Sequence, residues 1–135
     1  ISADLFFDLG RTDLKFSAKA QLDQIGRLLF ENNLFVNVVG HTDDLPTNSN
    51  QYPTNWELST ARACRVARYL IDNAGIAENR FFVTGHSSLI PLESNSSSVN
   101  RSLNRRVELI LVREIPYITE SNRRIIPGRE YNNEL

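Results

Sequence analysis

The pattern of apolar and polar positions along the chain predicts four short strands and two longer helices. Short apolar runs, most of them rich in β-branched or aromatic residues, predict strands at residues 3–7, 34–40, 80–85 and 107–112. Apolar side chains recur at helical spacing in two longer segments, residues 17–32 and 55–73. The order β-α-β-α-β-β predicts an α+β fold in which the helices pack on a small mixed four-stranded sheet.

Polar residues mark the ends of these elements and the connections between them. Ser17 and Asn55 are the predicted N-caps, and Gly75 is the predicted stop of the second helix. Residues 44–54 are rich in proline and asparagine and predict a loop, and loops of this length in compact domains are often functional. Residues 100–105 predict a turn or a short helix.

Length and composition indicate a single globular domain, which we place at residues 1–113. The periodicity is lost afterwards, so residues 114–135 are predicted to be a tail that wraps the surface or is disordered. The net charge of -1 does not favour nucleic acid as a partner, and no apolar run reaches the roughly 20 residues that span a bilayer. The chain begins at Ile1, so we expect an excised fragment, with room for a membrane anchor upstream. The single cysteine, Cys64, excludes an internal disulfide and is expected to be a structural thiol.

A carboxylate and a guanidinium flank the long loop. Asp43 follows the end of a predicted strand, and Arg62 lies in the second turn of the next helix. Held at the mouth of one cleft, these opposite charges would suit a zwitterion that carries an ammonium and a carboxylate on one carbon. The alternative is a turn aspartate and a solvated arginine, and Asp44 has the same ambiguity as Asp43.

Two further groups of residues invite both functional and structural interpretations. Arg105 and Arg106 open a predicted strand, so one side chain is expected to face the cleft while the other pairs with Glu108 or faces solvent. Trp56 is interpreted as a packing residue rather than a stacking platform.

His41 and His86 each follow a glycine at a strand end, which suggests a metal site completed by an aspartate. The alternative is that they are ordinary hydrogen-bonding residues. The sequence contains neither a glycine-rich phosphate loop nor a Gly-x-Ser-x-Gly nucleophile motif. We therefore predict no catalytic residue, no metal and no cofactor.

Five short motifs resemble those of OmpA-like C-terminal domains, the peptidoglycan-binding modules of bacterial envelopes. They are Leu5-Phe6-Phe7-Asp8-Leu9-Gly10, Gly40-His41-Thr42-Asp43, Leu58-Ser59-Thr60-Ala61-Arg62-Ala63, Gly85 with Pro91 and Asn95, and Asn104-Arg105-Arg106-Val107-Glu108. The long loop and its ending, Pro53-Thr54-Asn55-Trp56-Glu57-Leu58-Ser59, resemble the MotB-like branch, which anchors flagellar stators.

The resemblance implies a set of ligand-binding residues. Asp43 and Arg62 would hold the diaminopimelate of the peptide stem. Their supporting contacts and the residues that shape the pocket would be Asn55, Arg105, Asp8, Thr42 and Asn104. Two positions depart from the family pattern, because Ser87 replaces a usual glycine and Asp44 replaces a usual asparagine.

The resemblance also implies a function, which is non-catalytic binding of peptidoglycan to anchor an inner-membrane complex to the cell wall. The flagellar stator is the first expectation, with a periplasmic location, an upstream membrane anchor, a membrane partner subunit and homodimerisation. The alternatives are a wall-anchoring subunit of a type VI secretion system, a metallohydrolase centred on His41 and His86, and a pure protein-interaction domain.

Overall fold

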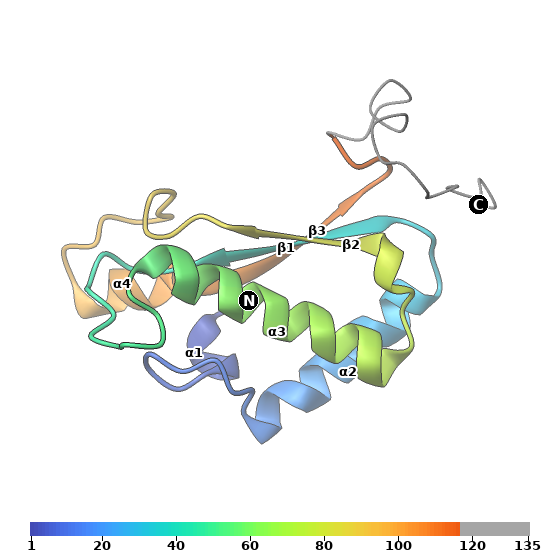
Figure 1. Cartoon of the computed structure of the whole chain (residues 1–135), viewed down its shortest axis with the longest axis horizontal. Coiled ribbons are helices and arrows are strands. Elements are labelled where there is room, and N and C mark those ends of the chain that lie inside the picture. The colour runs from blue at the N-terminus through green and yellow to red at the C-terminus, as the bar shows by residue number, and fades with distance from the viewer. Residues whose placement is uncertain (117–135) are drawn as a thin grey trace.

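The computed structural model describes residues 1–116 and shows two layers, a sheet and the helices that cover one of its faces (Figure 1). The elements in chain order are α1 (Ala3–Phe6), α2 (Phe16–Phe30), β1 (Phe35–His41), α3 (Asn55–Ala74), the 3-10 turn η1 (Glu78–Arg80), β2 (Phe81–Gly85), α4 (Ser98–Asn104) and β3 (Arg106–Val112). This confirms the α+β class and the mixed sheet.

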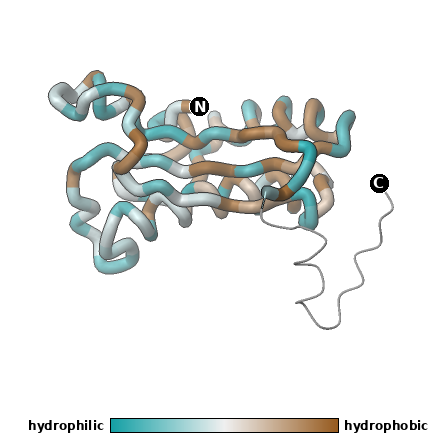
Figure 2. The backbone as a smooth tube through the Cα atoms, turned by 90° about the horizontal axis from the view of Figure 1, so that it is seen from above, coloured by the Kyte–Doolittle hydropathy of each residue, from teal (hydrophilic) through white to brown (hydrophobic). Residues whose placement is uncertain are grey.

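The sheet has three strands in the order β2-β1-β3, with β1 in the centre. β1 runs parallel to β2 and antiparallel to β3, so that Val38 lies opposite both Val83 and Leu109. Figure 2 looks onto the sheet, with the three strands in front of the helices. Because of these directions, the ends of β1 and β2 and the start of β3 meet at one end of the sheet. The loops that follow or precede them gather there.

The core lies between the sheet and the helices. Val36, Val38 and Val107 supply it from the strands. The helices contribute the apolar positions that the sequence periodicity predicted, with Ala18, Leu22 and Leu29 on α2 and Ala63, Val66, Ala67 and Leu70 on α3. Gly75 ends α3 in the left-handed conformation at φ 68°, as predicted.

The predicted first strand is wrong, and the sheet therefore has three strands rather than four. Only Ser2 pairs with β3, through an isolated bridge to Arg106, and the chain then forms the single helical turn α1. A strand would point Phe6 and Phe7 to opposite faces. The helical turn followed by an extended Phe7 buries both rings, and such a short apolar run does not distinguish the two conformations in sequence.

Three local predictions also need correction. The N-cap of α2 is Lys15 rather than Ser17. The N-cap of α3 is Thr54 rather than Asn55, because Thr54 and Glu57 form a reciprocal capping box. Cys64 is exposed and so is not a buried structural thiol. The predicted tail lies mostly outside the described residues. Within residues 1–116, no helix combines the length and apolarity needed to cross a membrane.

Two glycines let α3 approach the sheet closely at the end where the loops gather. Gly40 and Gly85 are register partners on β1 and β2. A Cβ on Gly40 would lie 2.0 Å from the carbonyl oxygen of Ser59, and one on Gly85 would lie 2.0 Å from Oγ1 of Thr60. The first turns of α3 therefore rest directly on the strands, which fixes the position of Arg62 one turn further on.

We predict that Gly40→Ala destabilises the fold by about 3 kcal/mol or more, because the added methyl meets helix backbone that cannot rotate away. Gly10→Ala is the control. Gly10 has φ +67° with open space around its Cβ position, so this change should cost only about 1 kcal/mol of backbone strain. Urea denaturation measures both, and a Gly40→Ala protein no less stable than Gly10→Ala would contradict the close approach.

Candidate functional site

The loops after β1 and β2 are joined to each other and to α3. The backbone N–H of Thr42 donates to the carbonyl of Ser87 at 2.9 Å, and that of His86 donates to Gly40 at 3.0 Å. The N–H of Ser87 donates to the hydroxyl of Ser59 at 3.1 Å. These bonds fix the backbone on either side of Asp43, so the site is built on strand ends and a helix rather than on a free loop.

Arg105, between α4 and β3, binds two carboxylates. Its Nε and Nη2 donate to the two carboxylate oxygens of Asp4 at 2.9 and 2.8 Å, and its Nη1 donates to Asp43 at 2.6 Å. The hydrogen bond from Arg105 lowers the pKa of Asp4, and the two carboxylates raise the pKa of Arg105. Asp4 and Arg105 are therefore charged at neutral pH, and the buried Asp43 lies directly against the guanidinium of Arg105.

Arg62 is only 3% exposed, so the alternative of a solvated arginine is wrong. Its Nε donates to the carbonyl of Arg11 at 3.1 Å, its Nη2 donates to that of Asp8 at 3.3 Å, and its guanidinium lies 5.3 Å from the centre of the Phe7 ring. Burial lowers the pKa of Arg62. The third nitrogen, Nη1, has no hydrogen bond within residues 1–116. The only side-chain atoms there that are both buried and without a hydrogen bond are the two ring nitrogens of His41, so Nη1 of Arg62 is accessible to solvent.

Asp4, Asp43, Arg62 and Arg105 form what we call the four-charge cluster. The charges of Asp4, Arg105 and Asp43 all act on Arg62, although no carboxylate oxygen within residues 1–116 lies within 4.0 Å of its nitrogens. The cluster contains two positive and two negative groups and is neutral as a whole. Such an arrangement can receive a ligand that carries one charge of each sign, because the free edge of Arg62 can donate to a carboxylate while Asp43 accepts from an ammonium.

Thr42 and Asn55 hold the backbone around Asp43. The Thr42 hydroxyl donates to the carbonyl of Asp43 at 2.9 Å. The Asn55 amide donates to the carbonyls of Asp43 and Leu45 at 3.2 and 3.0 Å. The Asp43 carboxylate also accepts the N–H of Leu45 at 3.0 Å. These residues position the carboxylate and leave Asn55 at the boundary between the cluster and the long loop.

Two other residues predicted to belong to the site lie elsewhere. The Asp8 side chain is 78% exposed, 3.4 Å from Lys15, and only its carbonyl touches Arg62. Asn104 is completely buried, and its amide binds the segment 92–95 through the backbone of Leu92 and Glu93 and the side chain of Asn95. The sequence analysis did not identify Asp4 as a site residue. The only feature in the sequence that could have indicated it is the position of an acidic residue between apolar residues near the start of the chain.

The neighbouring arginines divide as expected for adjacent residues on an extended backbone. While Arg105 enters the cluster, Arg106 donates to Glu108 at 2.6 Å on the other face. His41 and His86 stack there, with ring centres 5.3 Å apart. No three His, Cys, Asp or Glu side chains within residues 1–116 are grouped to hold a metal ion, so the described residues do not support the metal hypothesis.

The backbone conformation of Ser87 shows why the family pattern has a glycine at this position. It has φ 55°, a left-handed conformation that glycine adopts freely and that a residue with a Cβ adopts at a cost of about 1–2 kcal/mol. The backbone requirement for glycine therefore persists at this position. The hydrogen bonds between this loop, Thr42 and Ser59 hold the serine in that conformation.

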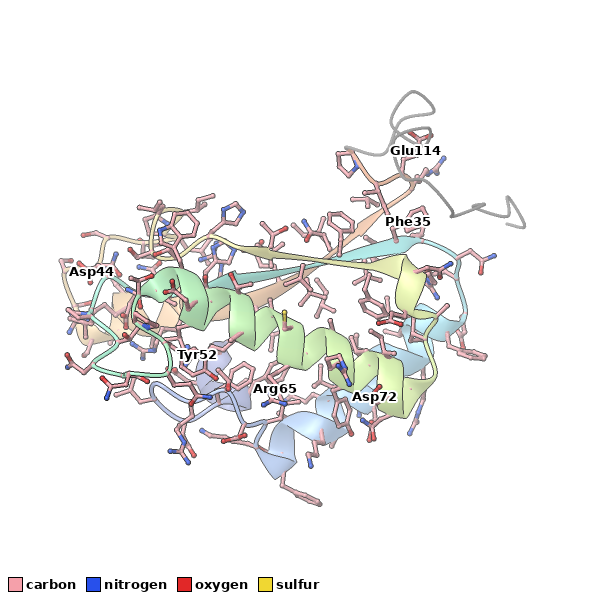
Figure 3. All side chains as sticks on the ribbon, viewed as in Figure 1. Phe35, Asp44, Tyr52, Arg65, Asp72 and Glu114 are labelled. Carbon is pink, nitrogen blue, oxygen red and sulfur yellow. The ribbon has the colours of Figure 1, made fainter. Side chains whose placement is uncertain are left out.

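An open groove of about 780 Å³ adjoins the cluster, between the long loop and the first turn of α3. Its lining residues are Asp44, Pro46, Thr47, Asn48, Ser49, Asn50, Pro53, Thr54, Asn55, Trp56 and Ser87. Figure 3 shows Asp44 and Tyr52 at this end of the molecule, far from Phe35 and Glu114 at the other. Trp56 lines this groove and is 50% exposed, so half of its side chain lies outside the packed interior.

The fold and the site together define a class of protein, an α+β domain with a charge-balanced polar site where the strand ends meet α3. The sequence matches the OmpA family over residues 6–105. The chain belongs to the OmpA family.

Individual relatives support the resemblance to the MotB-like branch. The chain is 34% identical over 107 residues to the uncharacterized protein YtxE of Bacillus subtilis and 31% identical over 115 residues to Motility protein B of that species. These matches cover 79% and 83% of this chain but 44% and 43% of the relatives, so the chain spans less than half their length. The structure resembles the cell wall anchor of the type VI secretion system from Pseudomonas aeruginosa, with a TM-score of 0.79 and 35% identity over 84% of this chain and 79% of that one.

The buried His41 predicts a specific pH dependence of stability. Its two ring nitrogens have no hydrogen-bond partner within residues 1–116, and burial, aided by the charge of Arg106, lowers its pKa from 6.5 to about 4. Between these values the unfolded chain binds a proton that the native protein does not. Stability should therefore fall as the pH drops from 6.5 towards 4, by about 1–2 kcal/mol, because a protonated His41 would be attracted by Glu108, 3.5 Å away, and this attraction offsets part of the cost of burial.

Urea denaturation at several pH values between 7 and 4.5 measures this effect, with His41→Asn as the reference protein. Asp4 does not interfere, because its lowered pKa places its titration below this range. Equal losses of stability in the wild type and the variant would show that His41 is not the group responsible.

Proposed function

We propose that this domain binds peptidoglycan non-covalently, through the diaminopimelate of the peptide stem, and thereby anchors an inner-membrane complex to the cell wall. The observation that carries the proposal is the four-charge cluster, in which a buried Arg62 keeps one nitrogen, Nη1, at the surface. In this interpretation Arg62 receives the ligand carboxylate and Asp43 the ammonium.

The burial of Arg62 favours this use of its charge. An ion pair between exposed groups is worth only about 0–1 kcal/mol, because water competes and both side chains lose freedom. The fold has already removed water from most of the Arg62 guanidinium and has fixed it through the carbonyls of Asp8 and Arg11. The Arg62 side chain therefore loses little conformational entropy when it donates to a ligand carboxylate.

A single pocket of this kind gives modest affinity, on the order of 10–1000 μM. Peptidoglycan is a polymer, however, and an assembly that carries several copies of this domain engages several stems at once. The second and later contacts are then effectively intramolecular, which increases retention by orders of magnitude. Weak sites in a multimeric anchor therefore suffice to hold a machine under load.

The relatives suggest which machine is anchored. The similarity to Motility protein B favours a flagellar stator, and the similarity to the cell wall anchor of the type VI secretion system supplies the alternative. For either machine we propose a periplasmic domain that acts as a homodimer, with an upstream membrane anchor and a membrane partner subunit. A binding role of this kind requires no catalytic residue. We propose it in place of the two alternatives, a metallohydrolase and a pure protein-interaction domain.

We predict that Arg62→Lys weakens binding to purified diaminopimelate-type sacculi at least tenfold, although the charge is kept. The two carbonyls are bound by separate nitrogens of the planar guanidinium, and the compact ammonium of lysine lacks the fork that spans them and the ligand. Co-sedimentation measures the effect, with Arg65→Lys as the matched control, because Arg65 is exposed on the same helix. Asp43→Asn should also bind weakly, and circular dichroism checks that each variant is folded.

The proposal would be wrong if Arg62→Lys, Asp43→Asn and the wild type all sedimented equally with sacculi. It would also be wrong if the folded wild-type domain did not bind them at all.

A further inference from the structure

Asp4 is the most exposed member of the four-charge cluster. Its side chain is 42% exposed, whereas the side chains of Arg105 and Asp43 are 17% and 8% exposed and Arg62 is almost completely buried. The carboxylate of Asp4 therefore borders both the buried charges and the solvent from which a ligand arrives. The proposed contacts with the peptide stem use Asp43 and Arg62 and do not involve it.

The fold holds the Asp4 carboxylate in one place. The helical turn α1 is attached to its surroundings on both sides of this residue, because the N–H of Ala3 donates to the carbonyl of Arg105 at 2.8 Å and Nζ of Lys15 donates to the carbonyl of Asp4 at 2.7 Å. The two carboxylate oxygens accept parallel hydrogen bonds from Arg105. Such a bidentate pair fixes the geometry of both groups, so the charge of Asp4 is a constant part of the site.

Asp4 acts on both arginines of the cluster, but in different ways. It binds Arg105 directly, and it acts on Arg62 through space, since no carboxylate oxygen within residues 1–116 lies within 4.0 Å of the Arg62 nitrogens. Burial lowers the pKa of Arg62, and the charge of Asp4 opposes this shift more than that of Asp43 does. Asp4 therefore balances the charge of Arg62 while leaving its Nη1 free to donate to a ligand.

Without Asp4 the cluster would carry a net positive charge, because Arg62 and Arg105 would face Asp43 alone. A site with a net positive charge attracts any carboxylate or phosphate, since the long-range part of the interaction depends on the net charges of the two partners. In the neutral cluster, a plain anion gains a hydrogen bond from Arg62 but is repelled by two carboxylates. A ligand with an ammonium beside its carboxylate is attracted at both ends and meets no such repulsion as a whole.

We propose that Asp4 determines the specificity of the site for a zwitterion, because its charge rejects ligands that carry a carboxylate without a neighbouring ammonium. This inference rests on the proposed binding of diaminopimelate. In this arrangement Asp43 and Arg62 supply the contacts with the ligand, and Asp4 supplies the discrimination against other anions. Asp4 is thus a specificity-determining residue that acts through the net charge of the cluster.

The test compares two small ligands on the whole chain, meso-diaminopimelate and pimelate, which has the same carbon chain and both carboxylates but neither ammonium. NMR titration at low ionic strength, where charges are least screened, measures the dissociation constant of each ligand. The wild type should bind diaminopimelate at least about tenfold more tightly than pimelate. In Asp4→Asn, which keeps the shape of the side chain, pimelate should bind more tightly than it does to the wild type, and the preference should fall about tenfold. A structural defect would not produce such a gain in affinity.

Asp4→Glu keeps the charge and should keep most of the preference, and Asp13→Asn, which removes an exposed acid outside the cluster, should keep all of it. The role of Asp4 would be overturned if the preference were unchanged in Asp4→Asn, or if Asp4→Glu or Asp13→Asn reduced it as much. Each of these outcomes would leave the stem-binding proposal intact, because the wild type would still bind diaminopimelate. If the folded wild type did not bind diaminopimelate at all, the stem-binding proposal itself would fail, and the role of Asp4 with it.

Discussion

The contact between the first turns of α3 and the end of the sheet determines the rest of this structure. Gly40 and Gly85 face each other across β1 and β2, and neither position has space for a side chain beneath Ser59 and Thr60. This proximity lets the Ser59 hydroxyl accept the N–H of Ser87, which ties the β2 loop to the helix. A helix lifted by even one methyl group would lose this bond and move Arg62 away from the carbonyls that hold it.

The same contact explains how residues distant in sequence form one cluster. Asp4, Asp43, Arg62 and Arg105 come from the first helical turn, the loop just after β1, the second turn of α3 and the residue just before β3. The mixed sheet brings Asp43 and Arg105 together, and the helix that rests on the two glycines adds Arg62. Asp43 and Arg62 are buried, and the cluster as a whole is neutral, so the arrangement avoids the uncompensated buried charge that would destabilise the fold.

The architecture could be predicted from the sequence wherever the apolar residues follow one clear pattern, either a strand-like run or helical spacing. β1, α3 and its glycine stop were predicted because β-branched runs and helical spacing are unambiguous over such lengths. The first segment, residues 3–7, was not, because four apolar residues around one aspartate fit either a strand or one helical turn. The location of Asp43 and Arg62 near each other followed from their positions at element ends. The burial of Arg62 and the role of Asp4 did not, since both depend on which backbone carbonyls and guanidinium groups the tertiary fold brings close.

Asp4 also resolves an apparent conflict between stability and the proposed function. Asp43 is paired with Arg105 in the structure, so a ligand ammonium at Asp43 would compete with that guanidinium for the carboxylate. Arg105 is held more extensively by Asp4, through two parallel hydrogen bonds, and under the proposed function it would keep this partner when Asp43 turned towards a ligand. Asp4 would therefore let Asp43 change partners without leaving Arg105, whose side chain is only 17% exposed, without a carboxylate partner. In this view Asp4, which the sequence analysis did not identify, makes Asp43, which it did identify, available for binding.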